Sequence, residues 1–383
     1  MRHPEQHRPD WKRKLVMGIV VASCTLCLVE VALRFTLGPP PPAVQVYSRS
    51  PITDGWFEES DGMIMPRFQA LFGIEDFRKG WIPEGSFKVD SPNRRFAVLG
   101  GSTVHGGTPD LHVSGEFPAL LGQATGSNGI NLGNPGLDSH DIVQIAEELR
   151  AYPMDAWVLY TGHNDFGNGY FLQRYQGWAG GFQAHARSVL EGLQLFWQLR
   201  SLGELTTTHG TEPDPEHQFD APGTEPAQKA HIQMDYLRNM RRIIWFAEQA
   251  NIPVVLVVPA SGLFMAPVGR CEDGASRKLW KQGMRQASEQ SPEATTSLQQ
   301  ARDADCIPLR ILSQAQDGLR ELARAPHVYL VDAPNELPRD PDTNVASSSL
   351  FFDHVHLSKR GHRQMADLIA PTLRQVLQSP STQ

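Results

Sequence analysis

The feature that most constrains the fold is the alternation of short apolar runs with longer segments of helical spacing. Most of these runs are continuously apolar, which is typical of parallel strands that are buried on both faces. The expected strands are residues 96–99, 130–132, 156–160, 253–258 and 328–331, and the expected helices are residues 139–150, 228–250, 313–324 and 359–377. Strands and helices that alternate in this way predict a three-layer α/β/α sandwich around a central parallel sheet of about five strands.

The N-terminus predicts a membrane anchor. Basic residues crowd positions 1–14, and residues 15–29 carry no charge. A helix over residues 15–37 would be about 34 Å long, enough for a hydrocarbon core of ~30 Å. Glu30 and Arg34 are spaced to pair on one face near the far end of this helix. By the positive-inside rule, we expect the N-terminus in the cytoplasm and everything after residue 38 in the periplasm or outside the cell.

Other interpretations of this N-terminal segment fit the sequence less well than a membrane anchor does. A cleaved signal peptide would need a small-residue cleavage site after the apolar run, and no convincing one follows. Residues 21–24 loosely match a lipoprotein cleavage box that ends at Cys24, but the apolar run continues past that cysteine. A buried core helix fits poorly between a basic run and the polyproline stretch that follows. We therefore expect a retained single span, with cleavage or lipidation at Cys24 left open.

Composition narrows the partners. The 383 residues include 35 Lys and Arg against 42 Asp and Glu, which gives a net charge of −7. No basic excess is left to neutralise a phosphate backbone, so we expect no nucleic-acid partner. The apolar helix predicts a lipid bilayer as one partner, and the sequence leaves the oligomeric state open.

The same patterns suggest domain boundaries and two insertions. The predicted segments are a basic tail at 1–14, an anchor at 15–37, a Pro-rich spacer at 38–50, an extension at 51–95, the main domain at 96–377 and a tail at 378–383. The main domain is interrupted at about 166–226 and about 260–312. The second insertion contains Cys271 and Cys306, which would form a disulfide outside the cytoplasm or remain as two free thiols. The sequence leaves both alternatives open.

Four short segments carry the polar residues that catalysis requires. Ser102, Gly136 and Asn164 each follow a predicted strand, and ligand sites in such folds lie at the carboxyl ends of strands. A glycine amide and an Asn side-chain amide both suit a developing oxyanion. Asp353 precedes His356 by three residues, so its carboxylate can reach Nδ1 of the imidazole and leave Nε2 to take a proton from serine.

Each segment also fits an ordinary turn when it is taken alone. The turn at Ser102 is neither a Gly-x-Ser-x-Gly elbow nor a phosphate-binding loop. Asp353, His354 and His356 could instead ligate a metal. The chain has no His-Glu-x-x-His motif and no further acidic cluster to complete such a site, so we expect no metal. Gly133 competes with Gly136 for the role of oxyanion donor.

Together, the four segments resemble the motif blocks of the SGNH, or GDSL-type, esterase and lipase superfamily, and the resemblance extends over about residues 96–377. The residues within these motifs resemble those of a bacterial membrane-anchored branch of the superfamily. The resemblance implies an SGNH hydrolase-like, flavodoxin-like fold. It implies that Ser102 is the nucleophile and that His356 is the general base, oriented by Asp353. The implied oxyanion donors are the amides of Ser102 and Gly136 and the side chain of Asn164. No metal or organic cofactor is implied.

Two positions need comment within this resemblance. Gly101 stands where the family usually has Asp, although that Asp is not the acid of the triad. Gly136 is preferred to Gly133 because it stands where the second block of the family places its glycine. His105 and His163 flank the presumed pocket, where each could contact substrate or be a structural histidine.

The resulting expectation is a membrane-tethered serine esterase that faces outward and acts through an acyl-enzyme. Its substrate would be an ester on a small molecule or a polysaccharide. One alternative keeps the site and makes the protein an O-acyltransferase or deacetylase of cell-surface polysaccharide. A second alternative is a catalytically silent binding module of the envelope, which has no need for five intact site residues.

Overall fold

The computed structural model describes residues 11–37, 55–66, 85–90, 92–106, 115–171, 195, 223–224, 226–271 and 274–378. The predicted spacer at 38–50, most of the insertion at 166–226 and nearly all of the terminal tail lie outside these residues. The chain divides into two compact units, one of residues 1–53 and 182–212 and one of residues 54–181 and 213–383. Each unit is described by itself.

The described part of the first unit is mainly the helix α1 (Trp11–Leu37). Its apolar stretch, Lys14–Thr36, has 23 residues, a mean hydropathy of 2.3 and no buried share. The helix is therefore long and apolar enough to cross a membrane, as a signal sequence also would be. Arg34 Nε lies 2.6 Å from Glu30 Oε1, which confirms the predicted pairing along one face.

The second unit is built on a parallel sheet of five strands in the order β5-β4-β6-β7-β8. The strands are β4 (Arg95–Gly100), β5 (Asn128–Gly133), β6 (Ala156–Tyr160), β7 (Val254–Val258) and β8 (Val328–Asp332). Successive strands after β4 are added first on one side of it and then on the other. The carboxyl end of β4 is thus the switch point where ligands bind in folds of this kind.

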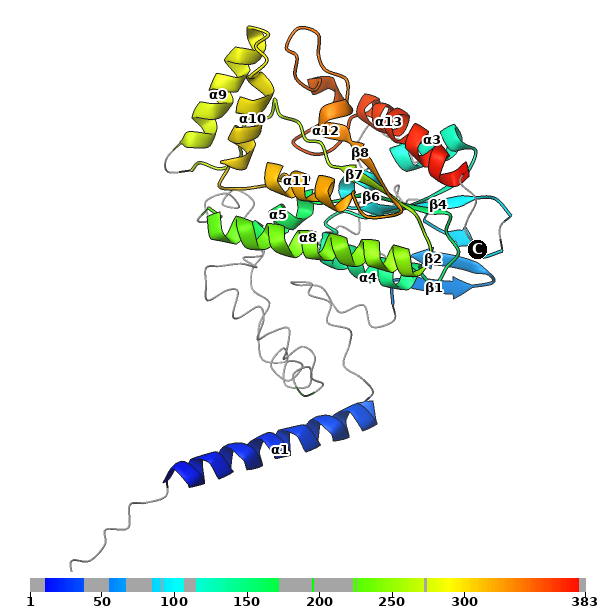
Figure 1. The fold of residues 1–383 in the computed structure, drawn as a ribbon, viewed down its shortest axis with the longest axis vertical. Coiled ribbons are helices and arrows are strands. Elements are labelled where there is room, and N and C mark those ends of the chain that lie inside the picture. Colours follow the sequence, from blue (N-terminus) through cyan, green and yellow to red (C-terminus); the bar gives the residue numbers. More distant parts are fainter. Residues whose placement is uncertain are drawn as a thin grey trace, which may run out of the picture. The chain divides into compact units, whose positions relative to one another are not determined.

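Helices cover both faces of this sheet (Figure 1). On one face, α3 (Phe117–Thr125) packs beside α13 (Lys359–Gln378), and their apolar side chains share a core with Val98, Val158 and Val255. On the other face lie α4 (Ser139–Leu149), α8 (Pro226–Gln249) and α11 (Ser313–Leu322). The predicted three-layer α/β/α sandwich is confirmed, and the predicted helices begin and end within about two residues of the observed ones.

Several strands and helices of the second unit were not predicted from the sequence. A small antiparallel sheet is formed by β1 (Phe57–Ser60), β2 (Met63–Pro66) and β3 (Phe87–Lys88). The second insertion contains α9 (Ala275–Ser288) and α10 (Ala294–Asp303), which pack on each other. The described residues of the unit also form the short helices α2 (Ser102–His105), α5 (His163–Phe171), α12 (Ala333–Glu336) and the 3-10 helix η4 (Ser348–Leu350).

The second insertion is closed by a disulfide. Cys271 and Cys306 are bonded, with their Cα atoms 5.7 Å apart. The choice that the sequence left open is therefore decided in favour of the disulfide. Cys24 and Cys27, in α1, are free and exposed.

Candidate active site

Ser102 is the first residue of α2. Two glycines precede it, Gly100 at the end of β4 and Gly101 after it, and both lie very close to neighbouring atoms. A Cβ at Gly100 would lie 2.2 Å from the carbonyl oxygen of Tyr160, and one at Gly101 would lie 2.5 Å from Asn164 Nδ2. No side chain fits at either position without a shift of these atoms. The glycine at position 101 thus allows a direct approach of the Asn164 amide to the backbone.

Ser102 lies at hydrogen-bond distance from the imidazole of His356. The Oγ of Ser102 is 2.7 Å from His356 Nε2, and His356 Nδ1 is 2.7 Å from Asp353 Oδ2. The backbone N–H groups of Val355 and His356 donate to Asp353 Oδ1 over 2.9 and 2.8 Å. Burial alone would raise the pKa of Asp353, but the hydrogen bonds from His356 and the charge of that imidazole lower it to about 2. The carboxylate is therefore ionised and oriented.

The loop that carries Asp353 and His356 lies between η4 and α13 and is closed by the donation of Phe352 N–H to His356 O over 2.8 Å. Its rear side rests on residues 261–269. Gly262 N–H donates to His354 O over 2.9 Å, and His354 Nε2 lies 3.0 Å from Ala266 O. The contact of His354 Nε2 with a backbone carbonyl does not favour the alternative in which Asp353, His354 and His356 ligate a metal.

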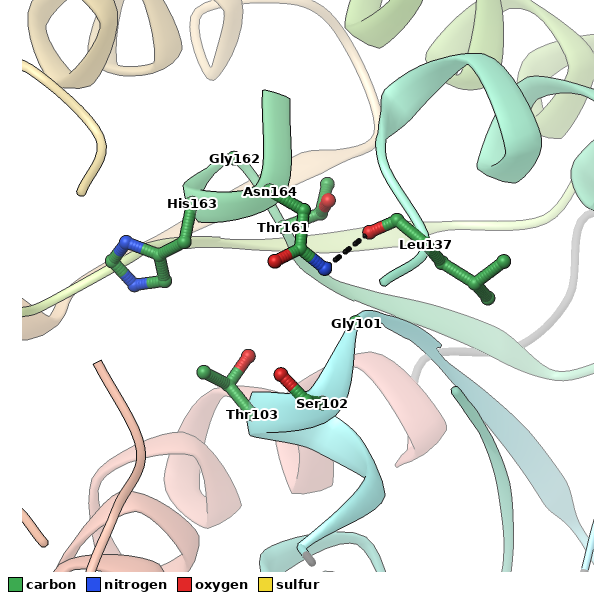
Figure 2. A pocket seen from close by; sticks show the side chains of 8 residues that line it. All are labelled: Gly101, Ser102, Thr103, Leu137, Thr161, Gly162, His163 and Asn164. Carbon is green, nitrogen blue, oxygen red and sulfur yellow. Dashed lines mark hydrogen bonds between the residues drawn. The ribbon is translucent and has the colours of Figure 1, made fainter. Parts of the chain in front are cut away.

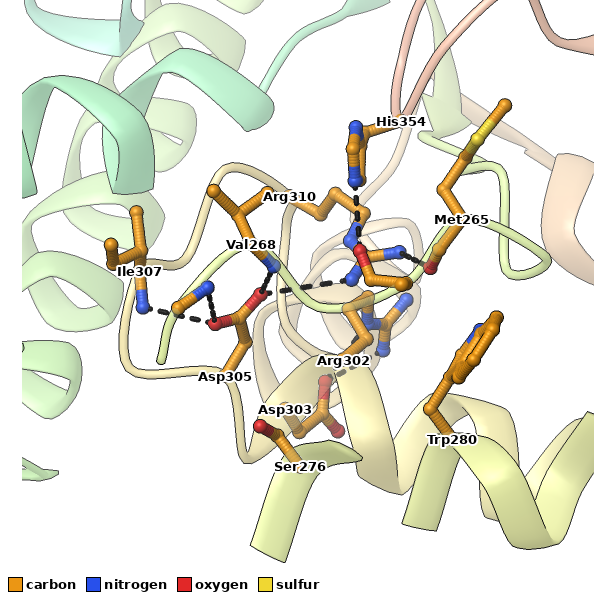
Figure 3. Close-up of polar contacts among 12 residues, drawn as sticks. Met265, Val268, Ser276, Trp280, Arg302, Asp303, Asp305, Ile307, Arg310 and His354 are labelled. Atoms are coloured by element: carbon orange, nitrogen blue, oxygen red, sulfur yellow. Dashed lines mark hydrogen bonds and ion pairs between the residues drawn. The ribbon is translucent and has the colours of Figure 1, made fainter. Parts of the chain in front are cut away.

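A buried arginine holds this rear segment (Figure 3). Arg310 is only 3% exposed and donates to the carbonyl oxygens of Gly262 and Met265 over 3.2 and 3.3 Å. Asp305 lies 3.9 Å from the guanidinium and accepts the N–H groups of Val268 and Gly269. Sequence reasoning missed this support, because nothing in the spacing of these residues links them to the triad. The only local signal is that Asp305 precedes the bonded Cys306.

The expected oxyanion donors lie across from Ser102. Asn164 is the second residue of α5, and its Nδ2 donates to Leu137 O over 2.8 Å. Gly136 has φ 79°, and Leu137 N–H donates to Asn134 O over 3.2 Å, as in a type II turn with proline and glycine at its centre. The amide of Gly133 donates instead to Asn131 Oδ1 over 2.9 Å.

A small pocket that is open to solvent lies beside Ser102. In it the hydroxyl groups of Ser102 and Thr103 face the side-chain amide of Asn164 (Figure 2). Among the described residues, the cavity is lined by Gly101, Ser102, Thr103, Leu137, Thr161, Gly162, His163 and Asn164. His163 is therefore at the cavity, as expected, whereas His105 is not among its described lining.

No family model matches the sequence, and no curated protein matches it. Solved structures do match. An acetyl xylan esterase is 15% identical over 73% of this chain and 99% of its own, with a TM-score of 0.37. A GDSL-like lipase from Bacteroides thetaiotaomicron is 12% identical over 74% and 88%, with a TM-score of 0.38. An acetylxylan esterase from Geobacillus stearothermophilus, solved as a catalytic mutant, is 12% identical over 75% and 95%, with a TM-score of 0.39. This chain is similar to GDSL-type hydrolases.

Two further histidines, His163 and His362, are buried and neutral. His163 accepts a hydrogen bond from Ile311 N–H at Nδ1 over 3.2 Å, and His362 accepts one from Phe117 N–H at Nδ1 over 3.1 Å. Burial, and then the charge of His356, lowers the pKa of each to about 3. For His163, the hydrogen bond from Ile311 N–H supports the alternative of a structural histidine, and contact with substrate stays a prediction. Substrate contact by His105 stays a prediction.

Two groups of side chains in the described part of the chain lie close enough together to hold a metal ion. One group is Cys271, Asp305 and Cys306, whose two sulfurs form the disulfide of the insertion. The other is Asp138, His140 and Asp165, whose carboxylates accept hydrogen bonds from neighbouring residues. Neither group is among the described residues that line the pocket beside Ser102.

Proposed function

We propose that this protein is a serine ester hydrolase of the SGNH type. The observation that carries the proposal is the continuous series of short contacts from Asp353 through His356 to Ser102. It stands at the switch point of the parallel sheet, beside a cavity with an amide donor on its opposite side. A base, an orienting carboxylate and a hydroxyl in this order activate a serine for acyl transfer.

In the proposed reaction, Ser102 Oγ attacks the carbonyl carbon of the ester while His356 Nε2 takes the hydroxyl proton. Asp353 stabilises the resulting imidazolium. The amides of Ser102 and Gly136 and the side chain of Asn164 donate to the oxyanion. The imidazolium then gives its proton to the leaving alkoxide, and an acyl-enzyme remains. Water, deprotonated by His356, attacks the acyl group and releases the acid.

The substrate of the proposed reaction is a carboxylic ester, and deacetylation of a cell-surface polysaccharide is the second candidate. The apolar helix α1 supports a membrane tether, with the hydrolase domain in the periplasm or outside the cell.

The test uses the full-length protein in detergent and a fluorophosphonate probe, which reacts with activated serines whatever the natural substrate. We expect labelling of Ser102 that disappears in Ser102→Ala and His356→Ala. The matched control is Ser288→Ala, which removes an exposed hydroxyl at the end of α9 and should label like the wild type. The rates on p-nitrophenyl acetate and octanoate then report acyl length. Equal labelling of wild type and Ser102→Ala would disprove the proposal.

A further inference from the structure

Side chains of helix α5 that lie one helical turn apart form hydrogen bonds to the turn at residues 134–139. Asn164 Nδ2 donates to Leu137 O over 2.8 Å. Asn168 follows four residues later on the same face of the helix, and its Nδ2 donates to Gly136 O over 3.1 Å and to Asp138 Oδ2 over 2.9 Å. Two successive carbonyls of the turn are thus held by two amides of one helix.

A buried carboxylate secures the next residue of the same segment. Asp165 is 4% exposed and accepts hydrogen bonds from the backbone N–H and the hydroxyl of Ser139. Asn239, on α8, donates to Ser139 Oγ over 2.9 Å from the opposite side. Burial and the charge of Asp138 raise the pKa of the Asp165 carboxyl, whereas the hydrogen bonds from Ser139 lower it. The end of the turn is therefore tied to both α5 and α8.

The orientation of the Asn164 amide depends on this turn. Nδ2 carries two hydrogens, and the donation of one of them to Leu137 O fixes the plane of the amide and therefore the direction of the other. The peptide between Gly136 and Leu137 follows a glycine in the left-handed region, which has little conformational preference of its own. Outside contacts must therefore hold that peptide, and among the described residues Asn168 is the side chain that bonds to the Gly136 carbonyl.

We propose that Asn168 is a positioning residue of the oxyanion hole. It holds Gly136 and Leu137 against α5, so that the Asn164 amide faces the ester carbonyl oxygen as negative charge develops there. Asn168 lies outside the four motif segments of the sequence. The inference rests on the proposed function, because it assigns a role within that reaction.

The test compares full-length wild type with Asn168→Ala and with Asn168→Asp, assayed on p-nitrophenyl acetate. Asn168→Asp keeps the shape of the side chain but replaces its donor with a carboxylate that faces Gly136 O and Asp138. We expect kcat to fall about 10-fold or more in both variants, less than for loss of a direct oxyanion donor, with KM changed less than about twofold. The matched control is Asn335→Ala, which removes an exposed amide bonded to Asp332 and should leave both constants unchanged.

Melting temperatures separate positioning from folding. A fall in kcat at unchanged KM in folded protein supports the proposal. Wild-type kcat in either folded variant overturns it, as does a fall in kcat that only follows the loss of folded protein. If Asn168→Ala does not fold, Asn168→Asp alone decides. If wild type shows neither turnover nor fluorophosphonate labelling, the proposed function itself fails. If wild type is active and Asn168→Asp matches it, only this inference fails.

Discussion

The two sides of the site are held by different means. On the oxyanion side, the carbonyl groups of Gly136 and Leu137 are bonded to α5 through the neutral amides of Asn168 and Asn164. On the acid–base side, the loop at 352–358 rests on residues 261–269, which the buried charge of Arg310 holds in place. The first support joins segments that follow β5 and β6, the two strands on either side of β4. The second comes from the disulfide-closed insertion.

This difference separates two kinds of sensitivity. Neutral amide–carbonyl bonds contribute about 1 kcal/mol each, so losing one should disturb geometry more than stability. A buried charge left without its partners destabilises the fold by several kcal/mol. We therefore expect substitutions behind the oxyanion side to act mainly on the rate of the reaction. Substitutions behind the acid–base side should act mainly on the free energy of unfolding.

The largest effect is expected on the acid–base side within the triad. In Asp353→Asn, the new amide group would donate to His356 Nδ1 and leave the imidazole proton on Nε2, where it faces Ser102. The base would then be blocked, and kcat should fall by about 10⁴-fold, the size known for the equivalent change in a serine protease. Asp317→Asn, at an exposed ion pair, is the matched control. A fall of less than about 10-fold would show that Asp353 does not set the tautomer.

A smaller loss is expected on the oxyanion side. Asn164→Ala removes one donor to the developing charge and should lower kcat by about 10²–10³-fold while the melting temperature changes little. The measurement is steady-state kinetics beside thermal unfolding. If Asn164→Ala retained full kcat, the oxyanion would have to be held by backbone amides alone.

The stability contrast is tested by two arginines. Arg310→Met removes a buried cation and leaves two carbonyls without their donor and Asp305 without its nearby positive charge, so the free energy of unfolding should fall by about 3 kcal/mol. The matched control is Arg320, which pairs with Asp332 at 2.8 Å nearer the surface, and Arg320→Met should lower the free energy of unfolding by about 1 kcal/mol or less. Urea unfolding at constant m-value measures both. A loss in Arg310→Met no larger than in Arg320→Met would show that the buried charge does not stabilise the acid–base side.

The smallest effect concerns a feature that both sides share, one buried histidine each. Below pH ~6.5 an unfolded chain protonates these imidazoles, whereas His163 and His362 resist protonation until about pH 3 when folded. Stability should therefore fall as the pH drops through this window. His362→Asn keeps an acceptor for Phe117 N–H but does not titrate.

We expect His362→Asn to shift the midpoint of acid unfolding down by about half a pH unit. The matched control is His327→Asn, an exposed histidine with φ 61°, a conformation that asparagine also tolerates. Circular dichroism during acid titration follows both variants. An unchanged midpoint in His362→Asn would mean that His362 does not contribute to the acid sensitivity.

Much of the fold could be predicted because its signals are local. The run at 96–99 is apolar at every position, and the strand found there is buried throughout. By contrast, β3 has only two residues, and its strand character depends on the pairing of Phe87 with Ile64. The helices α9 and α10 pack mainly on each other in a small separate core. They could not be predicted from the alternation of strands and helices, because they are not part of it.

The candidate site divides in the same way. The sequence indicates Ser102 and Asn164 because polar residues directly after buried strands are typical of a ligand site. It indicates Asp353 and His356 because a carboxylate three residues before an imidazole can orient it. Asn168 and Arg310 could not be found, since each acts through carbonyl groups, which every residue carries. Their roles depend on which backbone lies opposite them.

By itself, the sequence determined the apolar length of α1, the parallel sheet of buried strands, the order of the motif segments and the local reach of Asp353 to His356. Only the tertiary structure decided that Ser102 Oγ lies 2.7 Å from an imidazole 254 residues away, that Cys271 bonds to Cys306, and that Asn168 and Arg310 support the two sides of the site. The physical reason is one of range. Hydrophobic periodicity and turn chemistry act over a few residues, whereas contacts between distant side chains depend on how crossovers and insertions pack.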